Sequence, residues 1–333
     1  MKKAFSAILF SLGSLSAAQA QFAPQAGVSG TTAIAAGSSQ FVGWATHCDV
    51  QRGWMDIADK SLGKVSAGDS SVVIGPADNY IMSLGDSGVA VLTFASPIVN
   101  GPGYDFAVFE NGFANPLDAE QAYLELAFVE VSSDGINYVR FPAASNTQDS
   151  VQIAGTGEYM NARTINSLAG KYIGNYGTPF DLSELSGAAN LNLNNITHVR
   201  LVDVVGTIGA LGTVDANNHK INDPYPTPFP TGGFDLDAVG VINQSTTGVA
   251  SINGGTVYRI YPNPATDKIV FHCDRNPGAA TLFMTDVTGK NLFQRSVTGN
   301  DTEIDLNGYA AGLYYLVLTD AKGNKWVEKI SKL

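Results

Sequence analysis

The chain has 333 residues and a formal net charge of -11, with 15% charged residues, 44% hydrophobic residues and 36 glycines. An acidic surface repels phosphate backbones and anionic lipid headgroups, so this balance excludes a nucleic-acid-binding protein and a protein that binds anionic membranes through charge. Few charges and many glycines, together with many β-branched and aromatic residues, are typical of an all-β extracellular protein.

An export signal is predicted at the N-terminus. Lys2 and Lys3 precede the apolar run 4–15, and Ala18-Gln19-Ala20 has the small-x-small pattern at which signal peptides are cleaved. The run is too short to span a bilayer, and no other stretch is long and apolar enough, so no transmembrane segment is expected. Residues 1–20 are therefore predicted to be a signal peptide.

Short strands without intervening helices are predicted over residues 21–242. Each is rich in β-branched and aromatic residues and is bounded by turn residues such as Asp86-Ser87-Gly88. One helical turn is expected within 164–185. This pattern predicts a β-sandwich of the jelly-roll type. The candidate strands are 71–74, 80–84, 89–94, 105–110, 123–132, 138–141, 199–205 and 234–242.

Carboxylates recur on the apolar faces of these predicted strands. Strand alternation places Asp235 and Asp237, for example, on the same face as Val239. Buried carboxylates need partners, and residues 21–256 hold 8 basic residues against 22 acidic ones. A bound Ca²⁺ would neutralise two or three acids together; the alternative is that they accept backbone N–H groups or lie at strand ends. The candidate metal ligands are Glu110, Glu130, Asp203, Asp235 and Asp237.

The loop 215–223 is a second candidate for a cation site. Oxygen-bearing residues at its first, third and ninth positions follow the spacing of an Asp-rich calcium loop. However, Lys220 replaces the usual turn glycine and Pro226 stands where a Glu is needed. A polar surface loop is therefore the favoured interpretation.

Aromatic residues in the predicted turns and loops are candidates for ligand binding. Aromatic rings stack on the faces of sugars and flat cofactors, although each ring could instead cap one end of the core. Glu110 and Glu130 could also form the carboxylate pair of a glycoside hydrolase, although nothing in their spacing marks them as catalytic. The candidate ligand-binding residues are Trp44, Trp54, Tyr104, Phe113, Tyr225 and Phe229.

Residues 243–256 are small and polar and are predicted to be a linker, followed by a second β segment at 257–333. The order of three motifs, Tyr261-Pro262-Asn263-Pro264, Asp286-Val287-Thr288-Gly289-Lys290 and Ala311-Gly312-Leu313-Tyr314, closely resembles the C-terminal sorting domain of cargo of the Bacteroidetes type IX secretion system. The resemblance covers essentially all of 257–333. It implies a small Ig-like β-sandwich, the type IX secretion machinery as a partner, and a protein that is secreted or held on the outer cell surface. The alternative is an ordinary Ig-like module with a binding role.

Residues 41–242 resemble bacterial cell surface proteins in the phrases 100–112, 128–135 and 232–239. That family carries no defined activity, but the last phrase also resembles the closing strand of carbohydrate-binding jelly rolls, where an acid touches structural calcium. The sequence therefore predicts a non-catalytic surface protein that captures a carbohydrate or small ligand with structural Ca²⁺. Two alternatives stay open: a surface accessory for corrinoid uptake, and a glycan-active hydrolase.

Overall fold

The structure is a computed structural model that describes residues 22–155, 157–245, 258–273, 280–297, 299–319 and 325–333. The chain divides into two compact units, Met1–Gln244 and Ser245–Leu333. The predicted signal peptide and residues 246–256 of the predicted linker lie outside the described residues. Within the described ranges the elements are strands and three short 3₁₀ helices, so the all-β prediction is confirmed. No helix in these ranges has the length and apolar character needed to cross a bilayer.

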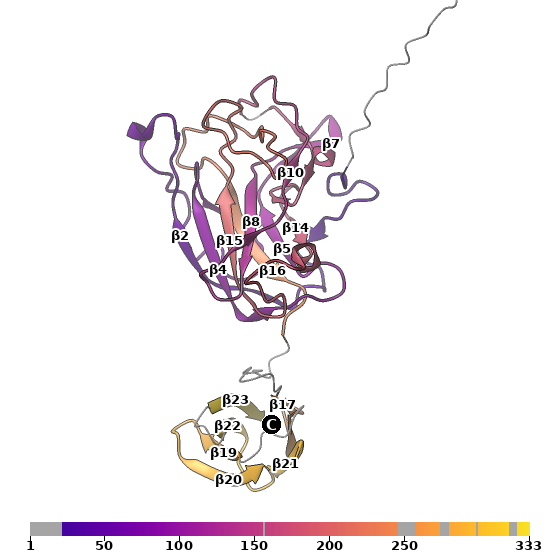
Figure 1. Cartoon of the computed structure of the whole chain (residues 1–333), viewed down its shortest axis with the longest axis vertical. Coiled ribbons are helices and arrows are strands. Elements are labelled where there is room, and N and C mark those ends of the chain that lie inside the picture. Colours follow the sequence, from indigo (N-terminus) through magenta and orange to yellow (C-terminus); the bar gives the residue numbers. More distant parts are fainter. Residues whose placement is uncertain (1–21, 156, 246–257, 274–279, 298, 320–324) are drawn as a thin grey trace, which may run out of the picture. The chain divides into compact units, whose positions relative to one another are not determined.

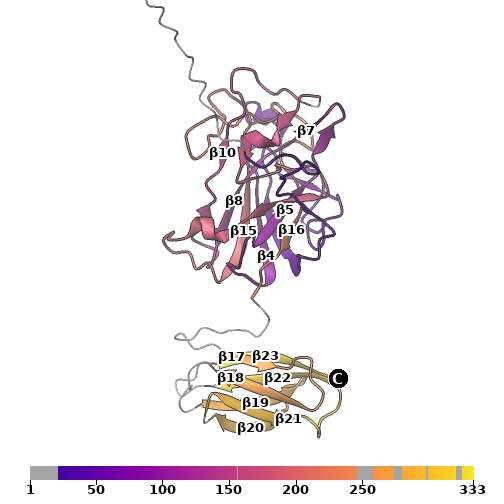
Figure 2. The same ribbon diagram turned by 90° about the vertical axis from the view of Figure 1, so that its right-hand side faces the viewer.

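One long antiparallel sheet forms the first unit and curls so that its two halves face each other. In Figure 2, β8 and β15 lie on one side of the unit, and β5 and β16 lie on the other. Two further strands, β3 (Met82–Ser83) and β9 (Val139–Arg140), pair with β16 and β8. The strand order is β1 (Ile34–Ala35), β14 (Tyr176–Phe180), β5 (Phe106–Glu110), β16 (Asp235–Val241), β2 (Gly43–Gln51), β4 (Val89–Ile98), β15 (Ile196–Asp203), β8 (Ala127–Ser132) and β13 (Leu168–Ala169).

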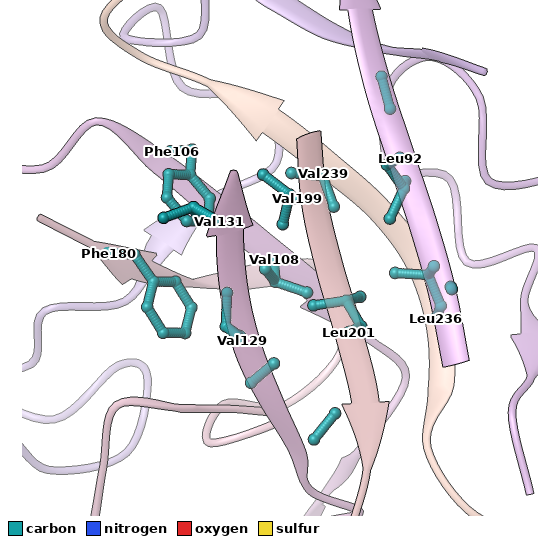
Figure 3. Close-up of a cluster of buried hydrophobic side chains, with 14 of the residues drawn as sticks. Leu92, Phe106, Val108, Val129, Val131, Phe180, Val199, Leu201, Leu236 and Val239 are labelled. Carbon is teal, nitrogen blue, oxygen red and sulfur yellow. The ribbon is translucent and has the colours of Figure 1, made fainter. Parts of the chain in front are cut away.

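The main hydrophobic core lies between these two halves. Val129 of β8 and Leu201 of β15 face Val108 of β5 and Leu236 of β16, and Figure 3 shows their side chains pointing toward one another. All four are essentially inaccessible to solvent. Burying a side chain of this size contributes roughly 1.5–3 kcal/mol, so the packing of the two layers stabilises the sandwich.

Smaller elements cover one end of the sandwich, where β7 and β10 are labelled in Figure 1. β16 begins at this end, where Asp235 and Tyr123 of β7 line one cavity. A second apolar cluster lies beneath these elements and includes Leu124, Leu126 and Phe128. The elements are two small sheets, β6 (Phe113–Asn115) with β7 (Asp118–Tyr123) and β11 (Met160–Asn161), and β10 (Ala144–Ser145) with β12 (Ile165–Asn166), and the 3₁₀ helices η1 (Lys60–Leu62) and η2 (Ala162–Thr164). The third 3₁₀ helix, η3 (Leu182–Leu185), lies at the opposite end, where the N–H of Leu182 donates to Asp105 just before β5.

Two β-bulges explain where strand alternation misled the sequence interpretation. In β2, which was not predicted, the register shifts between Ala45 and His47, so the buried residues Ala45 and Cys48 are three positions apart. In β16 the register shifts between Leu236 and Ala238. Leu236 and Val239 therefore both face the core, and Asp235 does not share a face with Val239 as alternation predicted. An extra residue at a bulge reverses the alternation beyond it.

Other boundaries differ in detail. Residues 71–74 form turns and bends and not the predicted strand, and the predicted strand 123–132 is divided between β7 and β8. The helical segment expected within 164–185 is present as the short helix η3.

The second unit is a small antiparallel β-sandwich, as predicted. Its core includes the rings of Tyr258, Phe271 and Trp326, whose centroids lie 5.6–5.7 Å apart. At the predicted hairpin turn, Asp286 accepts the N–H of Thr288 at 2.9 Å. One sheet has the order β17 (Tyr258–Tyr261), β18 (Lys268–Cys273), β21 (Asp301–Asp305), and the other β20 (Asn291–Val297), β19 (Ala280–Asp286), β22 (Gly312–Thr319), β23 (Lys325–Lys332).

Candidate functional site

A cavity of about 240 Å³ opens in the first unit where β5 ends and β16 begins. Three aromatic rings and several polar groups line it, contributed by three separate segments of the chain. The lining includes Phe113, Tyr123, Phe229, Asn111, Glu125 and Asp235.

The pairing of β5 with β16 positions one polar wall. Glu110, the last residue of β5, pairs with Leu236 of β16. Asn111 and Asp235 are the next residues on the two antiparallel strands and therefore lie opposite each other. The amide Nδ2 of Asn111 donates to Oδ2 of Asp235 at 3.2 Å, and the hydroxyl of Ser83 donates to Oδ1 at 2.5 Å. Burial raises the pKa of Asp235 to about 6 in spite of these two bonds.

The hairpin β6–β7 supplies the aromatic wall. Phe113 pairs with Tyr123 across the hairpin, and their rings stack with centroids 4.9 Å apart and planes 16° apart. Tyr159 meets Phe113 edge-on at 6.4 Å. Phe113 nevertheless stays 45% exposed, which leaves apolar ring surface accessible from the cavity.

Glu125 is the second acid of the lining, and sequence reasoning missed it. It stands between Leu124 and Leu126, which belong to the buried cluster beneath the small sheets, and its side chain extends to the cavity. Burial raises the pKa of its carboxyl well above the ordinary value, and the charges of Asp235 and Glu110 raise it further. The sequence signal that could have identified Glu125 is its position as a single acid between two leucines.

Further carboxyls lie buried behind the cavity. Glu110 accepts the N–H of Gly112 at 2.8 Å through Oε2, while its Oε1 is buried with no hydrogen-bond partner among the described residues. Asp223 accepts the N–H of Leu126 at 2.8 Å. Burial raises the pKa of both acids well above the ordinary range, and the charge of Asp235 adds to the effect at Glu110.

The loop 226–232 forms the remaining wall and carries Phe229, which is 60% exposed. The N–H of Phe229 donates to the carbonyl of Thr227 at 2.7 Å, and the N–H of Gly232 donates to the carbonyl of Phe229 at 3.0 Å. A Cβ at position 232 would lie 2.2 Å from the Thr227 carbonyl oxygen, so the turn requires glycine there. The loop thus presents an open aromatic ring from a backbone fixed by close contacts.

Two of the six predicted ligand-binding residues meet at this cavity, Phe113 and Phe229. Trp44 lies instead in a separate cluster, with its ring centroid 5.6 Å from that of Phe109. Tyr104 is half-buried, and its carbonyl oxygen accepts a hydrogen bond from a neighbouring side-chain amide.

The other two predicted aromatic residues have local partners. The ammonium groups of Lys60 and Lys64 lie 5.2 and 5.1 Å from the ring centroid of Trp54. The hydroxyl of Tyr225 donates to Oδ1 of Asp56 at 2.7 Å. Neither ring is among the residues that line the cavity.

The predicted metal ligands are only partly brought together. Asp235 lines the cavity and Glu110 lies behind it, but Glu130 is on β8, separated from β16 in the sheet by β2, β4 and β15. Glu130 accepts a hydrogen bond from Nε of Arg140 at 2.8 Å and another from Arg200. Asp237 accepts the backbone N–H groups of residues 78 and 79.

Asp203, the fifth predicted ligand, accepts the N–H groups of Ser87 and Phe234 at 3.1 and 2.7 Å. In the loop 215–223, Asp215 accepts the N–H groups of Asn217 and His219 at 2.8 and 2.9 Å and so closes the loop on itself. Across the described residues, no group of three or more His, Cys, Asp or Glu side chains is arranged to hold a metal ion.

Residues 259–332 match the family described as the secretion system C-terminal sorting domain. The match covers nearly the whole described part of the second unit, including the three sequence motifs.

No curated protein matches the sequence. Among solved structures, the BSP domain of a biofilm associated protein is 8% identical over 74% of this chain and 48% of that chain, with a TM-score of 0.21. PorZ, a surface component of the type-IX secretion system of Porphyromonas gingivalis, is 12% identical over 81% and 46%, with a TM-score of 0.20. A β-glucuronidase from Ruminococcus gnavus is 11% identical over 89% and 46%, with a TM-score of 0.22. The chain spans about half the length of these structures, and similarity this low does not extend to function.

Proposed function

We propose that the first unit is a non-catalytic binding module for a carbohydrate or similar small ligand. Residues 259–332 are a type IX secretion C-terminal sorting domain, so the protein is secreted or displayed on the outer cell surface. The proposed binding site is the cavity between the ends of β5 and β16.

The observation that carries this proposal is the chemistry of the lining. Aromatic rings with open surface, Phe113 and Phe229, stand with the amide of Asn111 and the carboxyls of Glu125 and Asp235. A sugar ring presents apolar C–H faces and a rim of hydroxyls, so it needs both aromatic surface and hydrogen-bonding groups. Ligand sites commonly combine apolar walls with a few placed polar groups in this way.

The volume of the cavity restricts the size of the ligand. Its volume of about 240 Å³ is below the roughly 300–1,000 Å³ that is usual for drug-sized ligands. One small ring therefore fits this cavity better than a corrinoid, which is far larger than a drug-sized molecule. This favours the carbohydrate or small-ligand hypothesis over corrinoid uptake.

A glycan array followed by calorimetric titration tests the proposal. Residues 21–333 would be applied to the array, and the best ligand would be titrated into wild type, Phe113→Ala and Phe229→Ala. Loss of an aromatic contact of about 1 kcal/mol or more predicts roughly five- to tenfold weaker binding for each variant. Tyr80→Ala, which removes an exposed ring outside the cavity lining, serves as the control. Binding that is unchanged in both cavity variants, or absent for every glycan, would reject the proposal.

The calcium ion predicted from the sequence stays a prediction. Several of the acids on which it was based accept backbone N–H groups, as Asp203 and Asp237 do. Thermal melting of the first unit with and without a chelator would decide the question. A lower melting temperature in chelator, restored by added Ca²⁺, supports the ion, and an unchanged melting temperature rejects it.

A further inference from the structure

The cavity has acids and no bases in its lining. Glu125 and Asp235 reach it, and no lysine, arginine or histidine is among the described residues that line it. Arg52 is the basic side chain whose charge acts on Asp235, but its guanidinium donates to backbone carbonyls, including that of Ala67 at 2.8 Å. The protein itself therefore brings no cation into the cavity.

Glu125 is poorly satisfied by its surroundings. It is 7% exposed, and its one hydrogen-bond partner among the described residues is the Tyr123 hydroxyl, at a long distance of 3.4 Å from Oε1. The charged groups that act on it are Asp235, Glu110, Asp223 and Asp203, all of them acids. A carboxyl in such surroundings gains a great deal from a cationic partner, because opposite charges interact strongly where water is excluded.

The aromatic walls favour the same kind of partner. Phe113 is stacked on Tyr123 and keeps ring surface exposed, and Phe229 is exposed on the opposite loop. The faces of aromatic rings attract cations, by roughly 0.5–2 kcal/mol depending on how well water is excluded. The acids and the aromatic ring faces of this cavity therefore each favour a positively charged ligand.

We infer that the ligand of this cavity is a small molecule that carries an ammonium group, of which an amino sugar with a free amine is the simplest example. The ammonium group donates hydrogen bonds to Glu125 and Asp235, and the ring of the ligand packs against Phe113 and Phe229. This inference rests on the proposed function and names the ligand class for the same cavity.

The ionisation of the carboxyls adds a second readout. Burial raises the pKa values of Glu125 and Asp235, the latter to about 6, so both lose protons more completely when a cation enters. Affinity for an amine should therefore rise with pH up to the pKa of the amine itself. The other charged or titratable groups acting on these two acids are Glu110, Asp203, Asp223, Tyr123 and Arg52.

Calorimetric titration of residues 21–333 with D-glucosamine, D-glucose, N-acetyl-D-glucosamine and ethanolamine tests the inference. D-Glucosamine should bind at least about tenfold more tightly than the two neutral sugars, because a charge-assisted hydrogen bond replaces a neutral one. Glu125→Gln and Asp235→Asn should each reduce that preference severalfold. Glu303→Gln, which removes one exposed acid from the second unit, should leave it unchanged. Far-ultraviolet circular dichroism and retained binding of a neutral sugar show that each variant is folded.

The outcomes separate the inference from the proposed function. Equal affinities for D-glucose and D-glucosamine, both lost in Phe113→Ala, would overturn the cationic ligand and leave a carbohydrate site. Binding of ethanolamine without any sugar would support the ammonium group and overturn the carbohydrate. Binding of neither amine would overturn the inference.

Discussion

The two units of this protein are both antiparallel β-sandwiches, but they place their acids differently. In the first unit Glu110, Glu125 and Asp203 are buried among apolar strands. In the second unit Asp286 fixes a turn, and Glu303 pairs with Lys268 on the exposed surface. Glu328 is the buried acid among the described residues of the second unit, whereas the first unit buries several acids and holds the cavity. Burying carboxyls costs free energy unless they have partners, so the acids beside the cavity are a feature of the first sandwich that core packing alone does not explain.

The largest expected effect is on export and follows from removing the sorting domain. Deletion of residues 259–332 removes the sorting domain and should leave nearly all of the protein in the periplasm of a host with a type IX system. Cell fractionation and surface immunolabelling measure the change, with Glu303→Gln as a full-length control. Normal surface display of the truncated chain would show that sorting does not depend on the second unit.

Core substitutions should affect one unit at a time. Phe106 lies in the first core and Phe271 in the second, both fully buried. Replacing either by alanine leaves a large cavity and should cost about 3–5 kcal/mol. Differential scanning calorimetry should show that Phe106→Ala lowers one transition and Phe271→Ala lowers another. A shift of every transition by either variant would contradict independent cores.

Asp235 of the first unit and Asp286 of the second predict opposite contributions to the pH dependence of stability. The folded state raises the pKa of Asp235 from 3.8 to about 6, so its contribution to stability is complete below pH 3.8 and is lost as pH rises through 6. The loss amounts to about 3 kcal/mol at 1.36 kcal/mol for each pKa unit. Hydrogen bonds from Thr288 lower the pKa of Asp286, so its contribution is lost as pH falls.

Denaturant unfolding between pH 4 and 8 measures the contribution of Asp235. The difference in unfolding free energy between wild type and Asp235→Asn isolates the single carboxyl, and wild type should lose stability relative to the variant as pH rises. A difference that does not change with pH would refute the assignment.

The smallest expected effect concerns the hairpin turn of the second unit. Gly289 has a φ of +82° and open space around it, so Gly289→Ala should cost about 1–2 kcal/mol through backbone strain alone. Gly308→Ala, at an equally open position without positive φ, is the matched control and should be neutral or slightly stabilising. Equal effects of the two changes on chemical denaturation would argue against strain.

The sequence was most informative where interactions are local. The turn 286–290 could be predicted because its residues bond to one another, with Asp286 accepting the N–H of Thr288. Strands β4, β5 and β15 were predicted because they are short runs rich in β-branched and aromatic residues and bounded by turn residues. Strand β2 was missed because its bulge places Ala45 and Cys48 three positions apart.

The sequence by itself determined the all-β class, the sorting domain and the recurrence of acids within the predicted strands. Only the tertiary structure decided which of them meet, because the cavity joins segments near residues 111–125, 154–155 and 226–235. Phe113, Phe229 and Asp235 were predicted as site residues for different reasons, and the pairing of β5 with β16 and the hairpin β6–β7 bring them to one place. Glu125 joined them unpredicted, because its role depends on neighbours about a hundred residues away in the chain.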